Sequence, residues 1–194
     1  MNRRSVRSSC ISVLAALGCQ AKSEPPPAPA LPEAVVVRDS KGTTLAEMRA
    51  GHPCRATIGP FELMVGGPPL IAQLGDTRWV GDDESNGTTL SRDNTPVARV
   101  FPVGDPTTAA VLDTQGVAMV RVHKSGGDVT VSNGAGQTVR HLHTRVDGTV
   151  IIDQPAATAT GTRDLVLVAL LTAPELAPEV RMIAACQRVL VKGS

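Results

Sequence analysis

The stretch Leu165–Leu171, with the sequence LVLVALL, decides the fold of this chain. All seven of its residues are apolar, so a helix formed here would need to be enclosed by the rest of the chain. The run is too short to cross a bilayer. It also fits a central strand of a β-sandwich, and periodicity alone does not separate the two structures. We expect a buried helix.

The sequence after this stretch predicts further helical structure. Pro178 suits the first turn of a helix, and Glu179 beside it complements the positive end of the helix dipole. The pattern turns Arg181 and Arg188 away from the core. The face that the helical spacing directs inward consists of Val180, Ile183, Ala184, Gln187 and Val191.

The chain before this stretch contains twelve short β-runs in six successive pairs. Most pairs place β-branched residues on either side of an Asp, Asn or Gly turn, which is typical of hairpins. The paired runs are 35–38 with 43–48, 61–65 with 70–74, 88–91 with 96–101, 110–112 with 117–123, 129–132 with 137–143, and 149–152 with a poorer run to 162.

Alternation within the runs supports strands with one buried face. In the run 117–123 the alternate positions Ala118, Val120 and Val122 are apolar, whereas Arg121 and His123 share the other face. The predicted fold class is therefore mainly β. We expect about twelve short antiparallel strands in successive hairpins, forming a barrel or a sandwich, with an apolar C-terminal helix.

Twelve strands followed by an apolar helix resemble the tubby-like barrel, whose family includes the plant LURP-one-related proteins and the phospholipid scramblases. The resemblance lies in the pattern of residues 35–191, and no motif matches residue by residue. It implies a closed barrel around a hydrophobic C-terminal helix. Members of the family often bind phosphoinositides or membranes, but no binding residue carries over to this sequence, and fold alone does not fix function.

The N-terminal segment has the layout of an export signal. Three arginines lie within the first seven residues and precede the apolar run Cys10–Leu17. This run is the length of a signal-peptide core, shorter than a membrane span. The segment ends at Gly18 and Cys19, whose thiol could carry a diacylglycerol.

Residues 1–19 resemble a lipobox, the cleavage motif of bacterial lipoproteins. That motif prefers Leu three residues before the cysteine and a small residue two before, whereas this chain has Ala16 and Leu17 at those places. The resemblance implies cleavage between Gly18 and Cys19 and lipidation of Cys19. The alternatives are an ordinary secretory signal cleaved near Gly18 or Ala21, and an uncleaved or cytoplasmic chain.

The predicted organisation has three parts. Residues 1–18 are the lipoprotein signal peptide, residues 19–34 are the lipidated cysteine and a Pro-rich tether, and residues 35–194 are a single globular domain. This arrangement predicts a protein that a lipid holds to the membrane of a bacterial cell envelope, with its domain in the periplasm or outside the cell. Gln20 is compatible with sorting to the outer membrane, which we expect rather than the inner one.

Charge and composition exclude some partners. Without the three arginines of the signal, 16 basic residues face 18 acidic ones, a formal charge of −2. Such a chain offers no strong basic field for phosphates, so we expect no nucleic-acid partner. Two Phe, one Trp and no Tyr leave little aromatic surface for stacking bases or sugars. The expected partners are the membrane and an envelope protein or lipid, and no cofactor is expected.

Two cysteines remain after the signal and the lipidated residue are set aside. Cys54 and Cys186 form an even pair in an oxidising compartment, which favours a disulfide. Two buried free thiols are the alternative. Cys54 also lies near His52, but a Cys–His nucleophile needs a third orienting group, and the sequence shows none.

An acidic cluster offers a weak candidate for calcium. Asp82, Glu84, Asn86, Gly87 and Asp93 stand at positions 1, 3, 5, 6 and 12 of an EF-hand-like loop. The flanking runs are strand-like, whereas an EF-hand needs helices. The alternative is a solvated acidic turn.

Three histidines offer a weak candidate for zinc or copper. His141 and His143 are two residues apart on one predicted strand and share a face, and His123 lies one hairpin earlier. The alternative is a solvent-exposed strand face that carries histidines without a metal.

These features favour a lipid-anchored cell-envelope protein that acts as a non-enzymatic structural or binding module. The alternative is a lipid- or metabolite-binding barrel of the tubby-like kind. A second alternative is a metal-dependent enzyme built on the His cluster.

Overall fold

The computed structural model describes residues 34–67, 69–84, 87–101 and 107–192. These residues belong to a single compact unit, 31–194, separate from residues 1–30. They form fourteen strands: β1 Val35–Asp39, β2 Thr44–Arg49, β3 Cys54–Ile58, β4 Phe61–Gly66, β5 Leu70–Leu74, β6 Thr77–Glu84, β7 Gly87–Arg92, β8 Thr95–Phe101, β9 Thr108–Leu112, β10 Ala118–Ser125, β11 Asp128–Asn133, β12 Thr138–Thr144, β13 Val150–Ile152 and β14 Ala157–Thr160.

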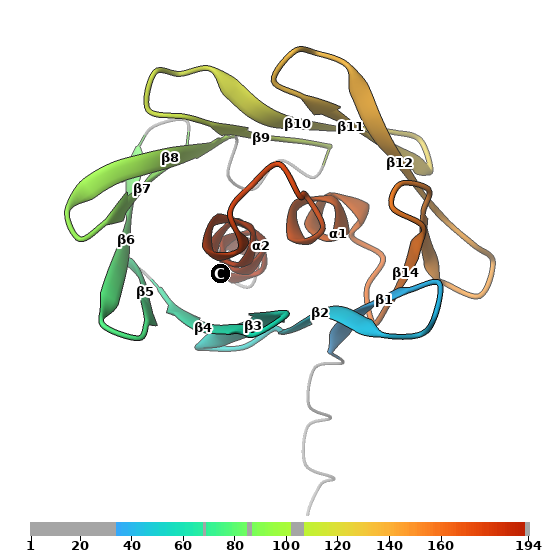
Figure 1. Ribbon diagram of the computed structural model, residues 1–194, viewed down its shortest axis with the longest axis horizontal. Helices are drawn as coiled ribbons and strands as arrows, with labels where there is room; N and C mark the ends of the chain where they lie inside the picture. Colours follow the sequence, from blue (N-terminus) through green and yellow to red (C-terminus); the bar gives the residue numbers. More distant parts are fainter. Residues whose placement is uncertain (1–33, 68, 85–86, 102–106, 193–194) are drawn as a thin grey trace, which may run out of the picture. The chain divides into compact units, whose positions relative to one another are not determined.

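The strands close into a barrel. Each strand pairs antiparallel with the next in sequence, and β1 pairs with β14, so no sheet edge is left open (Figure 1). This confirms the mainly β fold class and decides for a barrel over a sandwich. The predicted count of twelve strands is two short, because the sequence analysis did not identify β3 and β6.

Two helices, α1 Leu165–Leu171 and α2 Pro178–Lys192, lie inside the barrel (Figure 1). Every residue of α1 is buried, which confirms the expected enclosed helix and excludes the alternative strand. Asp164 is the N-cap of α1. The core is therefore the layer between the inward faces of the strands and the two helices.

The arginines of α2 are more buried than we expected. Arg188 was predicted to turn away from the core, but it is only 4% exposed, and Arg181 is half-buried. The prediction was wrong because it assumed a helix with one solvent face. The barrel surrounds α2, so polar side chains on its sides meet protein atoms.

Alternation along the strands separates the inside of the barrel from the outside. Ala118, Val120 and Val122 of β10 are buried, whereas Arg121 and His123 are exposed. Most of the other strands repeat this pattern, whereas β7 buries adjacent residues. Within the described part of the chain, no helix is both long and apolar enough to span a membrane.

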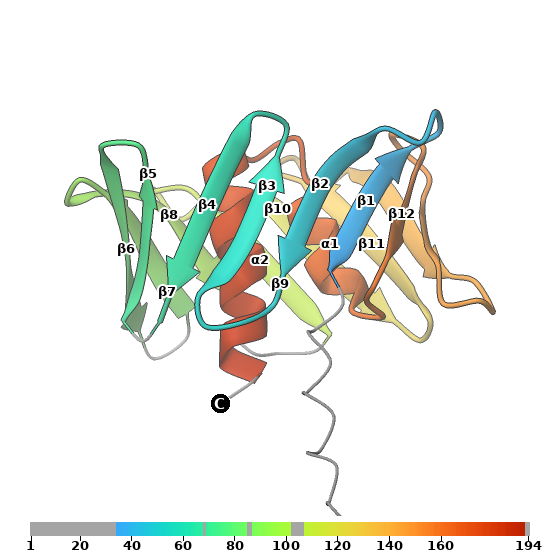
Figure 2. The ribbon, with the colours of Figure 1, turned by 90° about the horizontal axis from the view of Figure 1, so that it is seen from below.

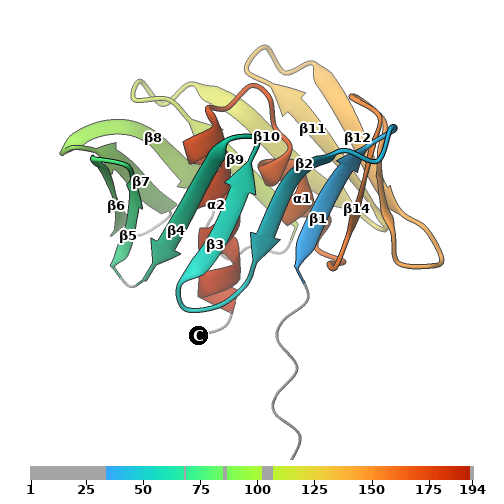
Figure 3. The ribbon, with the colours of Figure 1, turned by 60° about the horizontal axis from the view of Figure 1, so that its bottom comes forward.

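The barrel has two distinct ends. The near end holds the start of β1 and the end of α2, as Figures 2 and 3 show. The far end holds the β3–β4 turn, the β13–β14 turn and residues 172–177 between the helices. Each strand crosses from one end to the other, so residues at the two ends are separated by the length of the barrel.

Candidate functional site

A pocket of about 280 Å³ opens at the far end of the barrel, and we call it the far-end pocket. Strands β2, β3, β13 and β14 form its wall, and the C-terminal part of α1 with the following residues forms its floor. Its lining is mostly apolar and includes Leu45, Ile58, Ile152 and Leu171. Of the described residues that line it, Arg181 alone carries a charge.

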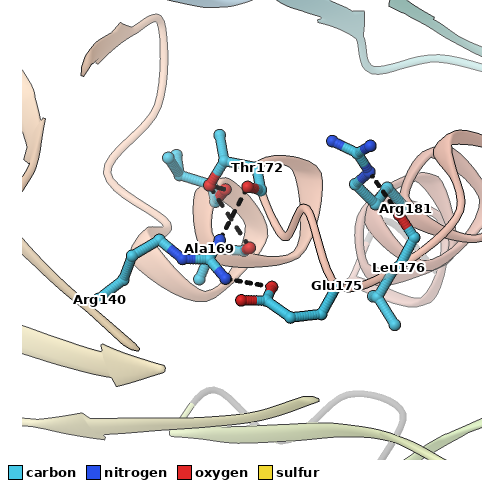
Figure 4. Close-up of polar contacts among 7 residues, drawn as sticks. Arg140, Ala169, Thr172, Glu175, Leu176 and Arg181 are labelled. Atoms are coloured by element: carbon cyan, nitrogen blue, oxygen red, sulfur yellow. Dashed lines mark hydrogen bonds and ion pairs between the residues drawn. The ribbon is translucent and has the colours of Figure 1, made fainter. Parts of the chain in front are cut away.

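Arg181 enters this site from the first turn of α2. Its Nε donates a hydrogen bond to the carbonyl oxygen of Leu176 at 3.0 Å. Figure 4 shows its two terminal nitrogens pointing away from Arg140 and Glu175, with no interaction drawn to them. Among the described residues these two nitrogens have no hydrogen-bond partner, so the guanidinium keeps most of its donors uncommitted.

The surroundings disfavour the charge of Arg181. Its pKa is lowered from the ordinary value, mainly by burial and then by the positive charge of Arg140. Glu175 and Glu179 act in the opposite direction but do not outweigh these two effects. The arginine stays protonated, because a guanidinium keeps its charge throughout the physiological pH range.

Arg140 fixes the floor of the site. It projects inward from β12, is 2% exposed, and donates from Nη1 to the carbonyl oxygen of Thr172 at 2.8 Å. Its Nη2 forms an ion pair with Glu175 (Figure 4). Thr172 is the C-cap of α1, so the guanidinium also lies at the negative end of that helix. One buried cation thus holds the segment that joins the two helices.

The sequence did not point to Arg140, to Glu175 or to the role of Arg181. A signal for Arg140 existed, because Arg140 has the same parity as the apolar Leu142 on its strand and therefore shares its inward face. An arginine at an inward position predicts a buried carboxylate or carbonyl partner. No comparable signal identifies Glu175 as that partner, because the two residues are 35 positions apart.

The calcium candidates do not come together. Asp82 and Glu84 lie on β6, where Asp82 pairs with Thr89. Asp93 lies in the β7–β8 turn and accepts a hydrogen bond from the backbone N–H of Arg78 at 3.0 Å. Asp82 lies four residue steps along β6 from Arg78, about 13 Å, so the carboxylates of Asp82 and Asp93 cannot share one ion. The weak EF-hand-like candidate gains no support, because β6 continues through the acidic run to Glu84.

The two other residues of that candidate have different outcomes. At Gly87 the paired strands β7 and β8 lie very close together. A Cβ at this position would come within 2.4 Å of the Val100 carbonyl oxygen. Its glycine serves strand packing and does not make a calcium-loop turn. Asn86 lies outside the described residues.

The three histidines lie on the outer face of the barrel and are exposed. His123 and His141 each pair with Thr130, one from either side, so two strand spacings of about 10 Å in total separate them. His143 follows on β12 beside Asp128. Among the described residues no three His, Cys, Asp or Glu side chains could hold a metal ion. The weak candidate gains no support, because β11 lies between the strands that carry His123 and His141.

Cys54 and Cys186 form a disulfide that joins β3 to α2. Their Cα atoms are 5.7 Å apart, a usual separation for a disulfide. Cys54 therefore has no free thiol, and His52 nearby is exposed. The structure therefore agrees with the sequence analysis in giving no support to a Cys–His nucleophile at this place.

Gly18 and Cys19, the predicted cleavage and lipidation site, lie outside the described residues. No family model matches this chain, and no curated protein or solved structure matches it either. The resemblance to the tubby-like family therefore stays a prediction beyond its architectural part, a barrel closed around helices.

Proposed function

We propose that this chain is a lipid-anchored, non-enzymatic binding module of the bacterial cell envelope, and that the far-end pocket is its binding site. The observation that carries the proposal is the far-end pocket, an apolar cavity that meets one guanidinium with uncommitted donors. Ligand sites are concave and mainly apolar, with a few polar groups that fix orientation. This pocket has that composition.

The covalent structure of the barrel supports export. Disulfides persist in the periplasm and outside the cell and are rare in the reducing cytosol. The Cys54–Cys186 bridge fits the destination that residues 1–19 predict. The outer membrane is the membrane we propose for the anchor, as Gln20 allows.

The two ends of the barrel suit a tethered module. Residues 19–34 would join the barrel at its near end, where β1 begins. A Pro-rich segment extends by about 3.1 Å per residue, so this tether could reach about 50 Å. The pocket lies at the end of the barrel away from the start of β1.

The test is the intact mass and location of the protein extracted from its own membranes. We expect acyl groups on Cys19, and we expect a Cys19→Ser variant to leave the membrane fraction. Cys10→Ser is the matched control, because Cys10 would be removed with the signal, and it should stay membrane-bound. An unacylated wild-type protein would contradict the anchor.

The intact mass of the membrane-extracted protein also tests the binding role. A retained mass beyond the lipid anchor would support a ligand-binding module. Turnover that depends on one specific side chain would overturn the non-enzymatic assignment.

A further inference from the structure

We propose that the far-end pocket takes a small amphipathic anion, with an apolar body in the cavity and a carboxylate or phosphate group on Arg181. This inference rests on the proposed function and specifies the ligand class. The cavity of about 280 Å³ is near the lower limit of small-molecule pockets, so the ligand is small or inserts one chain.

The wall of the pocket selects an apolar body. Ile58 and Ile152 come from strands on one side, and Leu171 comes from the end of α1. A polar body placed among them would lose its hydrogen bonds to water without replacement. An aliphatic chain loses none, and its burial is favourable.

Arg181 selects the head group. A guanidinium carries five N–H donors, and the bond to Leu176 uses the Nε donor. The remaining donors lie on the two terminal nitrogens, which match the paired oxygens of a carboxylate or phosphate. The same side chain would repel a cationic head group.

The neighbouring charges leave Arg181 available. Glu175 is engaged by Arg140 in an ion pair, so it does not neutralise Arg181 fully. Burial and, after it, the charge of Arg140 lower the pKa of Arg181, so its surroundings disfavour the cation. Glu179 is the remaining acidic neighbour and opposes an incoming anion. A bound anion would pair with the guanidinium and stabilise its charge.

The experiment is calorimetric titration of the full-length Cys19→Ser chain with decanoate, decyl phosphate, decanol and decyltrimethylammonium. We expect one molecule of decanoate or decyl phosphate to bind per chain, at least tenfold more tightly than decanol, with no binding of the cation. A preference for decanoate indicates a free fatty acid as the source. A preference for decyl phosphate indicates a phosphate ester such as a lipid head group.

Two variants and a control test the role of Arg181. Arg181→Gln should reduce the affinity for the anions at least tenfold and leave decanol binding unchanged, whereas Arg181→Lys should keep part of the affinity. Arg121→Gln, on the exposed outer face of β10, should behave as the parent chain. Circular dichroism and thermal unfolding check that each variant folds.

The outcomes separate this inference from the proposed function. Equal binding of decanol and decanoate, or anion binding that Arg181→Gln does not change, overturns the anion assignment and leaves a binding module. Failure of all four probes to bind also overturns it. Failure of the proposed function is seen elsewhere, in an unacylated Cys19 of the membrane-extracted protein.

Discussion

Asp164 contacts both helices inside the barrel, each through a different carboxylate oxygen. Its Oδ1 accepts a hydrogen bond from the backbone N–H of Leu167 at 3.2 Å and caps α1. Its Oδ2 pairs with Nε of Arg188 in α2 at 2.8 Å. The start of α1 and the last turns of α2 are therefore held together at the near end of the barrel.

Substitutions of Asp164 should separate these two contacts. Asparagine is as good an N-cap as aspartate but carries no charge, so Asp164→Asn should keep the cap and lose the ion pair. We expect a loss of about 1–3 kcal/mol in the free energy of unfolding, because Arg188 is buried. Asp164→Ala should lose about 1 kcal/mol more, for the cap. Urea unfolding measures both, and an Asn variant as stable as wild type would contradict the role of the ion pair.

Arg140 and Glu175 should show strong energetic coupling. Glu175→Gln leaves Arg140 buried with less compensation, whereas the double variant with Arg140→Met removes both charges. In a double-mutant cycle on unfolding free energies, we expect a coupling of about 1–3 kcal/mol. Additive effects would show that the contact does not stabilise the segment between the helices.

Loss of the disulfide should destabilise the barrel. Cys54 and Cys186 are separated by 132 positions, and the chain-entropy model gives about 4–5 kcal/mol for closing such a loop. We expect Cys54→Ala with Cys186→Ala to lower the melting temperature and the urea midpoint. Wild-type protein in reducing agent is the matched comparison, since it loses the same link without a change of sequence. Unchanged stability in both would contradict a structural role for the bridge.

A charge inside the barrel should prevent folding. Leu167 is 3% exposed in the middle of α1, so Leu167→Asp would bury a carboxylate among apolar side chains. We expect loss of the cooperative thermal transition. Val146→Asp is the control, because Val146 is fully exposed, and its change in stability should stay within about 0.5 kcal/mol. A normal transition for Leu167→Asp would contradict the packing of α1 inside the barrel.

A methyl group at Gly161 should disturb the closure of the barrel. Gly161 follows β14 with a φ of +81°, and a Cβ there would lie 2.0 Å from the Ala34 carbonyl oxygen. Gly42 has a similar φ of +83° with no atom within 4 Å of such a Cβ.

We therefore expect Gly42→Ala to lose about 1 kcal/mol, from backbone strain alone, and Gly161→Ala to lose clearly more. Hydrogen exchange of the amides in β1 and β14 locates the difference. Equal effects of the two substitutions would show that the steric clash is relieved at no cost.

The strands that the sequence revealed are those whose turns contain Asp, Asn or Gly between β-branched runs. The turn before β10 is an example, since Asp113 Oδ1 accepts hydrogen bonds from the N–H groups of Gln115 and Val117. β6 escaped notice because it ends in Asp82, Asp83 and Glu84, a run that is typical of loops. Pairing with β7 keeps the run extended, and this pairing is not visible in local sequence.

In the candidate sites too, the local sequence predicts only what depends on neighbouring residues. His141 and His143 do share a face, as their spacing predicted, because side-chain alternation is local. Whether His123 joins them depends on strand order, and β11 lies between β10 and β12. The pairing of Cys54 with Cys186 could be proposed by parity, but the contact between β3 and α2 required the complete barrel.

The sequence by itself determined the hairpin series, the parity of buried and exposed positions and the apolar character of Leu165–Leu171, because each depends on neighbouring residues. Only the tertiary structure decided that the barrel closes between β1 and β14, that Arg140 meets Glu175, and that Arg181 lines a pocket. These contacts join residues far apart in the chain. They form only when the barrel closes around both helices, and the pattern of neighbouring residues does not encode that closure.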